Sequence, residues 1–240
     1  MKDYVVVIPA RYNSKRFEGK PLANILGKTM IQRVYENCLQ AVPKELIFIA
    51  TDDNRIRDVA DGFGANTIMT SKNCLTGTGR VAEVAVKIKA KYYINVQGDE
   101  PIMDHNDILK VIKNISFNYG DIINGYCQID NEEDYRNPNI PKVVFRPDGR
   151  LLYMSRSAVP GNKNRDYKYA FRQVCIYAFP AIILEKFTQQ KNKTSLEEVE
   201  DIEILRFLEL GYEVRMVELS NSSISVDLKS DIQKVIQKLL

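Results

Sequence analysis

The chain begins with a run of four β-branched residues that strongly restricts its fold. Residues 5–8 read Val-Val-Val-Ile, and such a continuous run predicts a strand buried on both faces, as in a parallel sheet flanked by helices. The loop that follows carries three cations, Arg11, Arg16 and Lys20, among small residues. Open α/β sheets bind ligands at the carboxyl ends of their strands, so this loop predicts a phosphate site, with a solvated basic loop as the alternative interpretation.

Length and composition are those of one α/β enzyme domain. The 240 residues are 45% apolar and 27% charged, with a net charge of +3 that argues against a nucleic-acid partner. The four cysteines are far apart and form no CxxC pair, so neither a zinc site nor a disulfide framework is predicted. The sequence contains no run of signal-peptide or membrane-spanning length, which predicts a cytoplasmic protein without membrane insertion.

The first half of the chain alternates strands and helices. Helical spacing of apolar residues predicts a helix over residues 30–42, and another begins near residue 56. Apolar runs predict three further buried strands, at residues 46–50, 65–69 and 92–96. Residues 70–80 are expected to form a polar loop rich in threonine and glycine. This rhythm predicts a parallel sheet with right-handed crossovers.

Two aspartates, Asp52 and Asp53, follow the second strand. A carboxylate directly before a helix more often caps the helix than binds a metal, and we favour a cap here. The only histidine, His105, is expected to contribute to the cap of a helix over residues 108–115. No second histidine is available for a zinc cluster, and a nucleophilic triad is equally unsupported.

From residue 121 hairpins replace crossovers. Strand-like segments separated by turns predict an inserted antiparallel portion, and they lie at residues 125–129, 142–145, 151–155 and 173–179. One strongly charged helix is expected over residues 195–210. A strand over 214–219, a short strand ending at Asp227 and a closing helix over 229–240 complete the chain.

Asp99 and Asp227 each end a predicted strand. Asp99 follows Gly98, and Pro101 does not lead directly into a helix, so a Mg²⁺ ligand is favoured over a helix cap. Two carboxylates can hold Mg²⁺ between an α-phosphate and an attacking oxygen. A P-loop hydrolase and a dinucleotide-dependent oxidoreductase are both disfavoured, because the chain has neither GxxxxGK[ST] nor a GxGxxG after the first strand.

Several motifs, in order along nearly the whole chain, carry a resemblance to a known family. They read PARYNSKRFEGKPL, GKTMIQRVYE, ATDDNRI, MTSKNCLTGTGR, INVQGDEP, NPNIPKVVF, LLYMSRSAVP, IYAF, SLEEVEDIEILR and SVD. The chain resembles the CMP-Kdo synthetases, which are 3-deoxy-manno-octulosonate cytidylyltransferases. This resemblance implies a nucleotide-diphospho-sugar-transferase-like, Rossmann-like α/β fold with a mixed, mostly parallel sheet flanked by helices and an inserted antiparallel portion.

The resemblance also implies an activity and a set of site residues. A 3-deoxy-2-ulosonic acid, either Kdo or a Kdo-like sugar acid, would react with CTP to give the CMP-sugar and pyrophosphate, for lipopolysaccharide or capsule synthesis. The single domain over residues 1–240 would have a nucleotide-binding half (about 1–120) and a sugar-binding and dimerisation half (about 121–240), as a Mg²⁺-dependent homodimer. Nucleotide binding is implied for Pro9, Ala10, Arg11, Ser14, Arg16, Lys20, Ser71, Thr76, Gly77 and Arg80. Substrate binding is implied for Gln97, Arg156, Gln173, Tyr177, Glu197 and Glu198, metal binding for Asp99 and Asp227, and catalysis for Asp99, Asp227, Arg16 and Lys20.

Four positions depart from the family pattern. The family usually has an acidic residue at Gly79, His at Gln173, Gly at Cys175 and Gln at Glu198. Most of these changes fall in the sugar half, which indicates the same chemistry on a different sugar acid. A carboxylate at Glu198 would suit an amino-substituted acceptor. Two alternatives stay open: an idle relative that acts as a binding or regulatory subunit, and a nucleotidyltransferase for another nucleotide or acceptor, such as a uridylyltransferase acting on a sugar phosphate.

Overall fold

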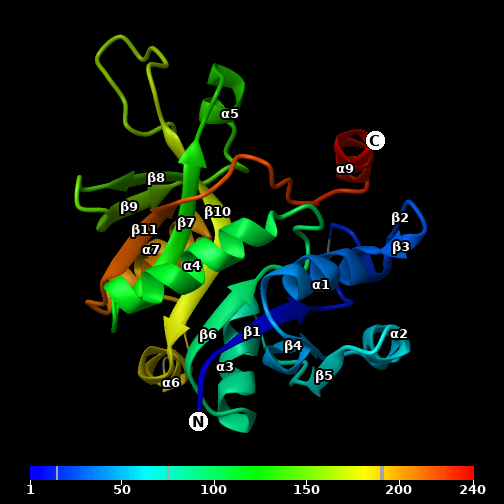
Figure 1. The fold of residues 1–240 in the computed structure, drawn as a ribbon. Helices are drawn as coiled ribbons and strands as arrows, with labels where there is room; N and C mark the ends of the chain where they lie inside the picture. The colour runs from blue at the N-terminus through cyan, green and yellow to red at the C-terminus, as the bar shows by residue number, and fades with distance from the viewer. Residues whose placement is uncertain (15, 75, 190–191) are drawn as a thin grey trace.

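One mixed sheet runs through both halves of the chain. The computed structural model describes residues 1–14, 16–74, 76–189 and 192–240, and within these residues nine strands form the main sheet (Figure 1). Its central path is β11-β7-β10-β6-β1-β4-β5, with β8 beside β10 and β9 beside β8. The strands are β1 (Lys2–Ala10), β4 (Ile47–Thr51), β5 (Asn66–Met69), β6 (Ala90–Val96), β7 (Ile122–Gln128), β8 (Lys142–Phe145), β9 (Leu151–Ser155), β10 (Phe171–Pro180) and β11 (Val214–Glu218).

Strand direction divides the sheet into a parallel and an antiparallel part. β1 pairs in parallel with β4 and with β6, and β4 pairs in parallel with β5. β10 runs antiparallel to β6, β7 and β8, and the β8–β9 hairpin continues this antiparallel portion. β11 closes the far edge in parallel with β7. The expected mixed, mostly parallel sheet with an antiparallel insertion is therefore confirmed.

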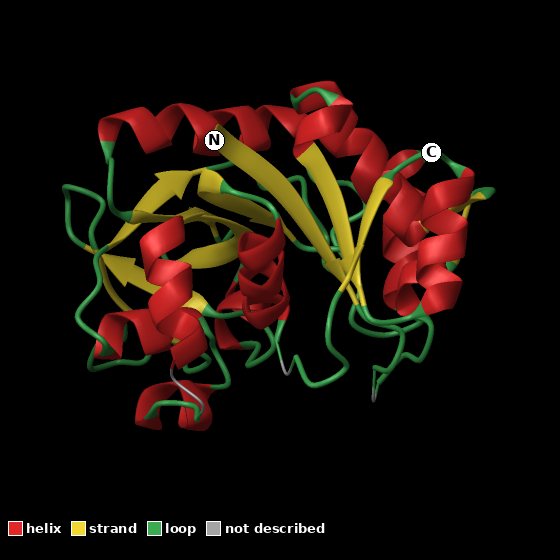
Figure 2. Cartoon of the chain, turned by 90° about the horizontal axis from the view of Figure 1, so that it is seen from below, coloured by secondary structure: helices red, strands yellow, loops and turns green. Residues whose placement is uncertain are grey.

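Helices cover both faces of this sheet, as Figure 2 shows. The longer helices are α1 (Met30–Ala41), α2 (Asn54–Gly62), α3 (Gly77–Lys87), α4 (His105–Phe117), α6 (Ala181–Gln189) and α9 (Asp231–Leu239). The short ones are α5 (Glu132–Arg136), α7 (Ser195–Glu200), α8 (Ile204–Glu209), η1 (Lys20–Leu22) and η2 (Lys44–Leu46), and β2 (Asn24–Ile25) pairs with β3 (Lys28–Thr29) in a small hairpin. None of the helices in the described ranges is long and apolar enough to cross a membrane.

The β-branched run of β1 is buried on both sides, as predicted. Val6 and Ile8 join the core that α1, α2 and α4 cover, and Val5 and Val7 join the core that α3, α6 and α8 cover. All four side chains are fully buried. Because successive side chains of a strand point to opposite faces, a strand of this composition is stable only between two layers of helices.

Three predicted features of the chain are wrong. Residues 77–80 are the first turn of α3 and not part of a loop; Thr76 caps this helix by accepting a hydrogen bond from the Gly79 N–H. The expected charged helix over 195–210 is two short helices, separated where Asp201 takes a left-handed conformation with φ of 50°. The expected short strand that ends at Asp227 is not present within the described residues, where β11 ends at Glu218 and α9 is the next element.

The end of β6 lies very close to the end of β1, and this contact requires a glycine. A Cβ atom on Gly98 would lie 2.6 Å from the backbone oxygen of Pro9. Backbone cannot move aside as a side chain can, so Gly98→Ala should destabilise the fold by about 1–3 kcal/mol. We expect a fall in the melting temperature of about 2–4 °C for each kcal/mol.

The matched control is Gly62→Ala, at the end of α2, where an added Cβ meets nothing within 4 Å. This variant should melt at or above the wild-type temperature, because Ala favours helix over Gly. Equal melting temperatures for Gly98→Ala and Gly62→Ala would show that the close approach of β1 and β6 does not constrain the fold.

Candidate active site

A large cavity opens where the parallel strands end. It has a volume of about 1630 Å³ and lies beside the carboxyl ends of β1 and β6. The first turn of α3, the exposed side of β10 and the segment before α9 complete its wall. Ligand sites in open α/β sheets are found at this edge, so the topology alone marks the cavity as the candidate site.

The loop after β1 is folded back on itself at the mouth of this cavity. The Gly19 N–H donates to the Tyr12 carbonyl at 2.9 Å, and Gly19 has a φ of 68°, which an L-residue with a side chain rarely adopts. The Tyr12 ring stacks beneath the Arg55 guanidinium at 3.3 Å, and Asp53, which caps α2, holds Arg55 at 2.7 Å. These contacts hold Tyr12 and Gly19 in place, and Lys20 directly follows Gly19.

Two carboxylates that are far apart in the sequence meet at this loop. The Lys20 ammonium nitrogen lies 2.6 Å from Asp99 Oδ2 and 3.9 Å from Asp227 Oδ1, and it also donates to the Val226 carbonyl at 2.8 Å. Arg16 pairs with the same Asp227 oxygen at 2.8 Å. Lys20 is mostly buried, with 15% of its side chain exposed, whereas Arg16 is exposed. The burial makes the Lys20 pair the stronger of the two interactions, since exposed ion pairs contribute little.

The Asp99 and Asp227 pair has the chemistry of a magnesium site. Mg²⁺ in phosphoryl-transfer enzymes takes oxygen ligands, usually one or two carboxylates together with substrate phosphates. In the part of the chain that the structure describes, no cluster of three or more His, Cys, Asp and Glu side chains is arranged to hold a metal. Asp99 and Asp227, which share Lys20, would therefore supply some of the ligands of a metal ion, and the substrate would supply others.

The amino end of α3 forms another wall of the cavity. Arg80 is almost fully buried there, where it donates to the Thr70 hydroxyl at 2.5 Å and lies 3.3 Å from Asp52. The Thr78 N–H donates to the carboxylate of Glu203 at 3.2 Å. Burial raises the pKa of Glu203 above its ordinary value. The Thr78 and Gly79 N–H groups at the start of α3 are thus already paired, with Glu203 and Thr76, and Glu203 places an acid at the positive end of this helix.

β10 presents Gln173, Cys175 and Tyr177 to the cavity, because alternate residues of a strand share a face. The Gln173 amide donates to Asn124 Oδ1 and to the Tyr177 hydroxyl, each at 3.0 Å. Burial raises the pKa of both the Cys175 thiol and the Tyr177 hydroxyl well above their ordinary values. These groups therefore meet a ligand as neutral hydrogen-bonding side chains.

Arg156 lines the cavity and is held by backbone oxygens. Its guanidinium donates to the carbonyls of Glu200 at 2.6 Å, Pro138 at 3.0 Å and Asp201 at 3.0 Å. The Glu200 carboxylate accepts from the Arg156 backbone N–H at 2.8 Å. Among the described residues Arg156 forms no ion pair, and the backbone around it fixes its orientation.

Several cavity residues were not predicted from the sequence, and Glu100, Arg172 and Glu203 are among them. Glu100 is buried and accepts a hydrogen bond from the Ser223 hydroxyl. Burial, with the nearby charge of Asp99, raises the pKa of Glu100 to about 7. Arg172 has one sequence signal, its position directly before Gln173. Glu203 lies within an acidic run of the sequence. The sequence does not reveal the break between α7 and α8, and therefore does not show which of these acids points into the cavity.

Most of the residues implied by the resemblance surround this one cavity. They are Pro9, Ala10, Arg11, Ser14, Arg16, Lys20, Thr76, Gly77, Arg80, Gln97, Asp99, Arg156, Gln173, Tyr177, Glu197 and Asp227. Ser71 and Glu198 are not among the lining residues. Ser71 is exposed, and its N–H donates to Glu83 at 2.7 Å.

The position of Glu198 corrects the expectation that it meets the acceptor. Glu198 is exposed on α7, whereas its neighbour Glu197 is buried, because consecutive helical residues point about 100° apart. The Glu197 carboxylate already pairs with the Arg206 guanidinium at 2.5 and 2.7 Å. Glu197 is also part of the capping box of α7. In this structure Glu203 is the acid from this region that approaches α3.

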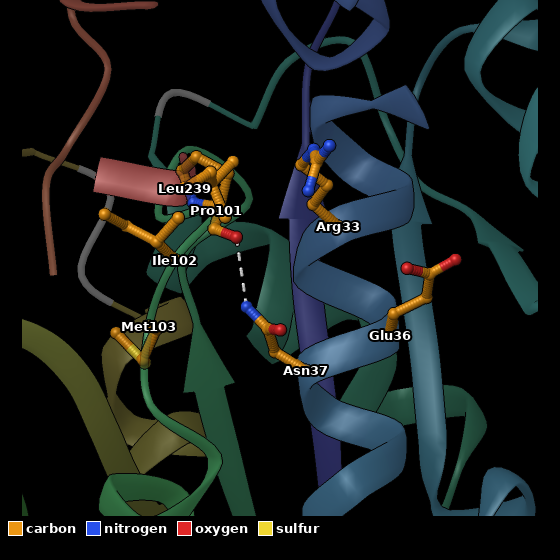
Figure 3. Close-up of a pocket in the computed structure, with 7 residues that line it drawn as sticks. All are labelled: Arg33, Glu36, Asn37, Pro101, Ile102, Met103 and Leu239. Atoms are coloured by element: carbon orange, nitrogen blue, oxygen red, sulfur yellow. Dashed lines mark hydrogen bonds between the residues drawn. The ribbon is translucent and has the colours of Figure 1, made fainter. Parts of the chain in front are cut away.

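A second, smaller pocket lies behind the loop that carries Asp99 (Figure 3). Its volume is about 210 Å³, and it shares no lining residue with the large cavity. The Asn37 amide donates to the Pro101 carbonyl at 3.0 Å across it. None of the predicted site residues lines this pocket, which is formed by Arg33, Glu36, Asn37, Pro101, Ile102, Met103 and Leu239.

Comparisons with known proteins show which family the chain belongs to. Residues 5–218 match the cytidylyltransferase family. The chain is 41% identical to the 3-deoxy-manno-octulosonate cytidylyltransferase of Syntrophotalea carbinolica, with 95% of each chain covered. It is 38% identical to the mitochondrial enzyme of that name from Arabidopsis thaliana, over 96% of this chain and 81% of the relative.

The structure superposes on that of a CMP:2-keto-3-deoxy-manno-octonic acid synthetase complexed with CTP. The TM-score is 0.92 at 33% sequence identity, over 99% of this chain and 98% of the other. Sequence and fold thus agree with one another, and the chain belongs to the 3-deoxy-manno-octulosonate cytidylyltransferase family of cytidylyltransferases.

Proposed function

We propose that this chain transfers the cytidylyl group of CTP to 3-deoxy-manno-octulosonate and releases pyrophosphate. The names of its relatives and the CTP complex of a similar protein support this activity. The observation that carries the proposal is the meeting of Lys20 with Asp99 and Asp227 at the carboxyl ends of the parallel strands. A triphosphate needs cations, and a metal that bridges phosphates needs carboxylates.

The reaction is a displacement at the α-phosphorus of CTP. A hydroxyl oxygen of the sugar acid forms a bond to phosphorus and loses its proton, and the bond to the oxygen that bridges to the β-phosphate breaks. Arg16 and Lys20 would bind the β- and γ-phosphates, because the loop after β1 presents both cations at the cavity mouth. Their charge stabilises the pyrophosphate as it leaves, which is the main catalytic requirement in such transfers.

Asp99 and Asp227 would hold Mg²⁺. When bound, the ion neutralises phosphate charge and brings the reacting oxygen and phosphorus together. The Lys20 ammonium lies between these carboxylates, so we expect it to turn toward the phosphates when nucleotide and metal bind. Because Gly98 lies close to Pro9, Asp99 lies beside the loop that follows β1.

The acceptor would bind against β10, Arg156 and Arg172. A sugar acid carries a carboxylate, and an Arg guanidinium binds carboxylates with two parallel hydrogen bonds. Gln173 and Tyr177 offer neutral amide and hydroxyl groups for the sugar hydroxyls. In this proposal the first half of the chain binds the nucleotide and the second half binds the sugar. CTP as the donor also supports a cytoplasmic site of action.

The activity itself is tested by pyrophosphate release. With CTP, 3-deoxy-manno-octulosonate and Mg²⁺, the protein should release pyrophosphate and form the CMP-sugar, and UTP should give much less. Asp99→Asn should lower turnover by about two orders of magnitude or more, because a neutral amide does not balance the metal charge. Its melting temperature should stay near that of the wild type, which separates lost catalysis from lost folding.

Absence of turnover in the wild-type protein, together with unchanged melting temperature on adding CTP and Mg²⁺, would contradict the proposal. Near-normal turnover by Asp99→Asn would show that this carboxylate is not the metal ligand. Binding of CTP without turnover would instead favour an idle relative, although the retained Asp99 and Asp227 pair speaks against this.

Acceptor preference should not depend on Glu198. The side chain is exposed and outside the cavity, so Glu198→Gln should leave kcat/KM for the sugar acid within about twofold. The structure thus gives no support for selection of an amino-substituted acceptor by this carboxylate. The measurement is a comparison of 3-deoxy-manno-octulosonate with its 8-amino counterpart on the wild type and the variant.

Glu197→Gln is the matched comparison one residue away. It leaves Arg206 buried without a charged partner, so it should destabilise the protein by about 3–5 kcal/mol. A change of acceptor preference in Glu198→Gln, at unchanged stability, would show that α7 reaches the sugar after all.

We further propose that the enzyme works as a homodimer that uses the antiparallel portion. β9 is an edge strand that pairs with β8, and Leu152 on it is 56% exposed. Exposed edges with apolar side chains favour association. Light scattering at micromolar concentration should give twice the chain mass of 27.5 kDa, and Leu152→Lys should shift the protein toward the single-chain mass. A wild-type mass of one chain at that concentration would contradict the dimer.

A further inference from the structure

The segment that leads to Asp227 has no regular secondary structure. Hydrogen bonds that involve side chains hold most of it in place. We call residues 220–227 the serine strap; it reads Ser-Asn-Ser-Ser-Ile-Ser-Val-Asp. In Figure 1 it runs from the end of β11, past β7, toward α9. A segment without a helix or strand must be positioned by specific contacts, because its own backbone does not fix its course.

The first contact of the strap is with a buried carboxylate outside the cavity. Asp107, in the first turn of α4, is fully buried. Its oxygens accept from the Ser220 N–H at 3.0 and 3.1 Å and from the Ser220 hydroxyl at 2.5 Å. Ser222 shares a further hydrogen bond with the Ser220 hydroxyl at 2.6 Å. A buried carboxylate is costly unless several donors satisfy it, so Asp107 and Ser220 hold each other in one arrangement.

The next contacts bind the strap to both sides of the cavity. Arg172 donates to Asn221 Oδ1 at 2.7 Å, and the Ser223 hydroxyl donates to Glu100. Farther along, the Val226 N–H donates to the Asp99 carbonyl at 3.0 Å. The chain from Ser220 to Asp227 is therefore fastened at intervals, and its upstream end is the one fastened to Asp107.

The role of Asp107 differs from that of an ordinary helix cap. Asp104 is the residue that caps α4, by accepting from the Asn106 N–H at 2.8 Å. Among the described residues, Asp107 accepts hydrogen bonds from Ser220 and lies 3.6 Å from the exposed Lys110 ammonium. Asp107 is absent from the cavity lining, so it acts on the site through the strap.

We propose that Asp107 is a positioning residue: by holding Ser220 it fixes the serine strap, and with it the place of Asp227 opposite Asp99. The consequence for the metal rests on the proposed function, in which Asp227 is a Mg²⁺ ligand. The mechanical part, in which Asp107 orders the strap, does not rest on it. Loss of Asp107 should raise the Mg²⁺ requirement without removing any ligand of the ion.

The test uses the full chain with Asp107→Ala and Ser220→Ala, and with Asp104→Ala as the control on the same helix turn. Hydrogen exchange of residues 220–227 is measured without nucleotide or metal. Asp107→Ala should speed this exchange by about tenfold or more, since hydrogen bonds to a charged group are lost. Ser220→Ala should give a smaller increase, because its backbone donor remains. Asp104→Ala should lower the melting temperature and leave strap exchange unchanged.

The second readout is the Mg²⁺ concentration that gives half-maximal pyrophosphate release. It should rise several-fold in Asp107→Ala and stay at the wild-type value in Asp104→Ala. Unchanged strap exchange in both Asp107→Ala and Ser220→Ala, or an equal increase in Asp104→Ala, would overturn the proposal. Faster strap exchange with an unchanged Mg²⁺ requirement would refute the positioning of Asp227. A wild-type protein that releases no pyrophosphate would defeat the proposed function, and the exchange result would still decide whether Asp107 orders the strap.

Discussion

Two carboxylates that are far apart in the sequence share one ammonium group, and the rest of the site is arranged around this contact. Lys20 lies 2.6 Å from Asp99 and 3.9 Å from Asp227, and all three side chains are at least partly shielded from water. Each comes from a different part of the fold: the loop after β1, the end of β6 and the segment before α9. Because a partly desolvated cluster of this kind needs opposite charges close together, the three segments must be held together by the surrounding structure.

The surrounding structure supplies that constraint in two ways. The parallel pairing of β1 with β6 brings their carboxyl ends to the same edge, and Gly98 allows the two chains to come into close contact there. Within the described residues no strand leads to Asp227, and the segment before it is held by hydrogen bonds such as those of Ser220 to Asp107 and of the Val226 N–H to the Asp99 carbonyl. The sheet thus positions Lys20 and Asp99. The serine strap positions Asp227, and the strap can be altered without disturbing the core.

The sequence predicts the parts of the fold that depend on local patterns. The β-branched run of residues 5–8 indicated a doubly buried strand, and Asp53 caps α2 as expected. The start of α3 escaped prediction because Gly77 and Gly79 are poor helix formers, and the Thr76 cap with the packing of later residues overrides them. The break at Asp201 lies in a run of acids whose charge pattern does not change, so no local signal marks it.

The same limits apply to the site. Most of the residues implied by the motifs line one cavity, but Glu198 does not. Neighbouring residues on a helix point about 100° apart, so Glu198 points away from the cavity that Glu197 lines. Glu203 reaches the cavity through the break between α7 and α8, which only the three-dimensional structure reveals. Contacts between distant segments, such as Ser223 with Glu100, likewise leave no periodic signal in the chain.

The central claim is that Asp99 and Asp227 form a metal site and that Lys20 is its neighbour on the phosphate side. The most direct measurement is a crystal structure with CTP and Mn²⁺, located by anomalous scattering, since manganese takes the same oxygen ligands as magnesium. The account predicts an anomalous peak in contact with oxygens of both aspartates and of CTP, with the Lys20 ammonium moved from Asp99 to a phosphate. A peak elsewhere in the cavity, or a Lys20–Asp99 pair that persists with nucleotide bound, would contradict it.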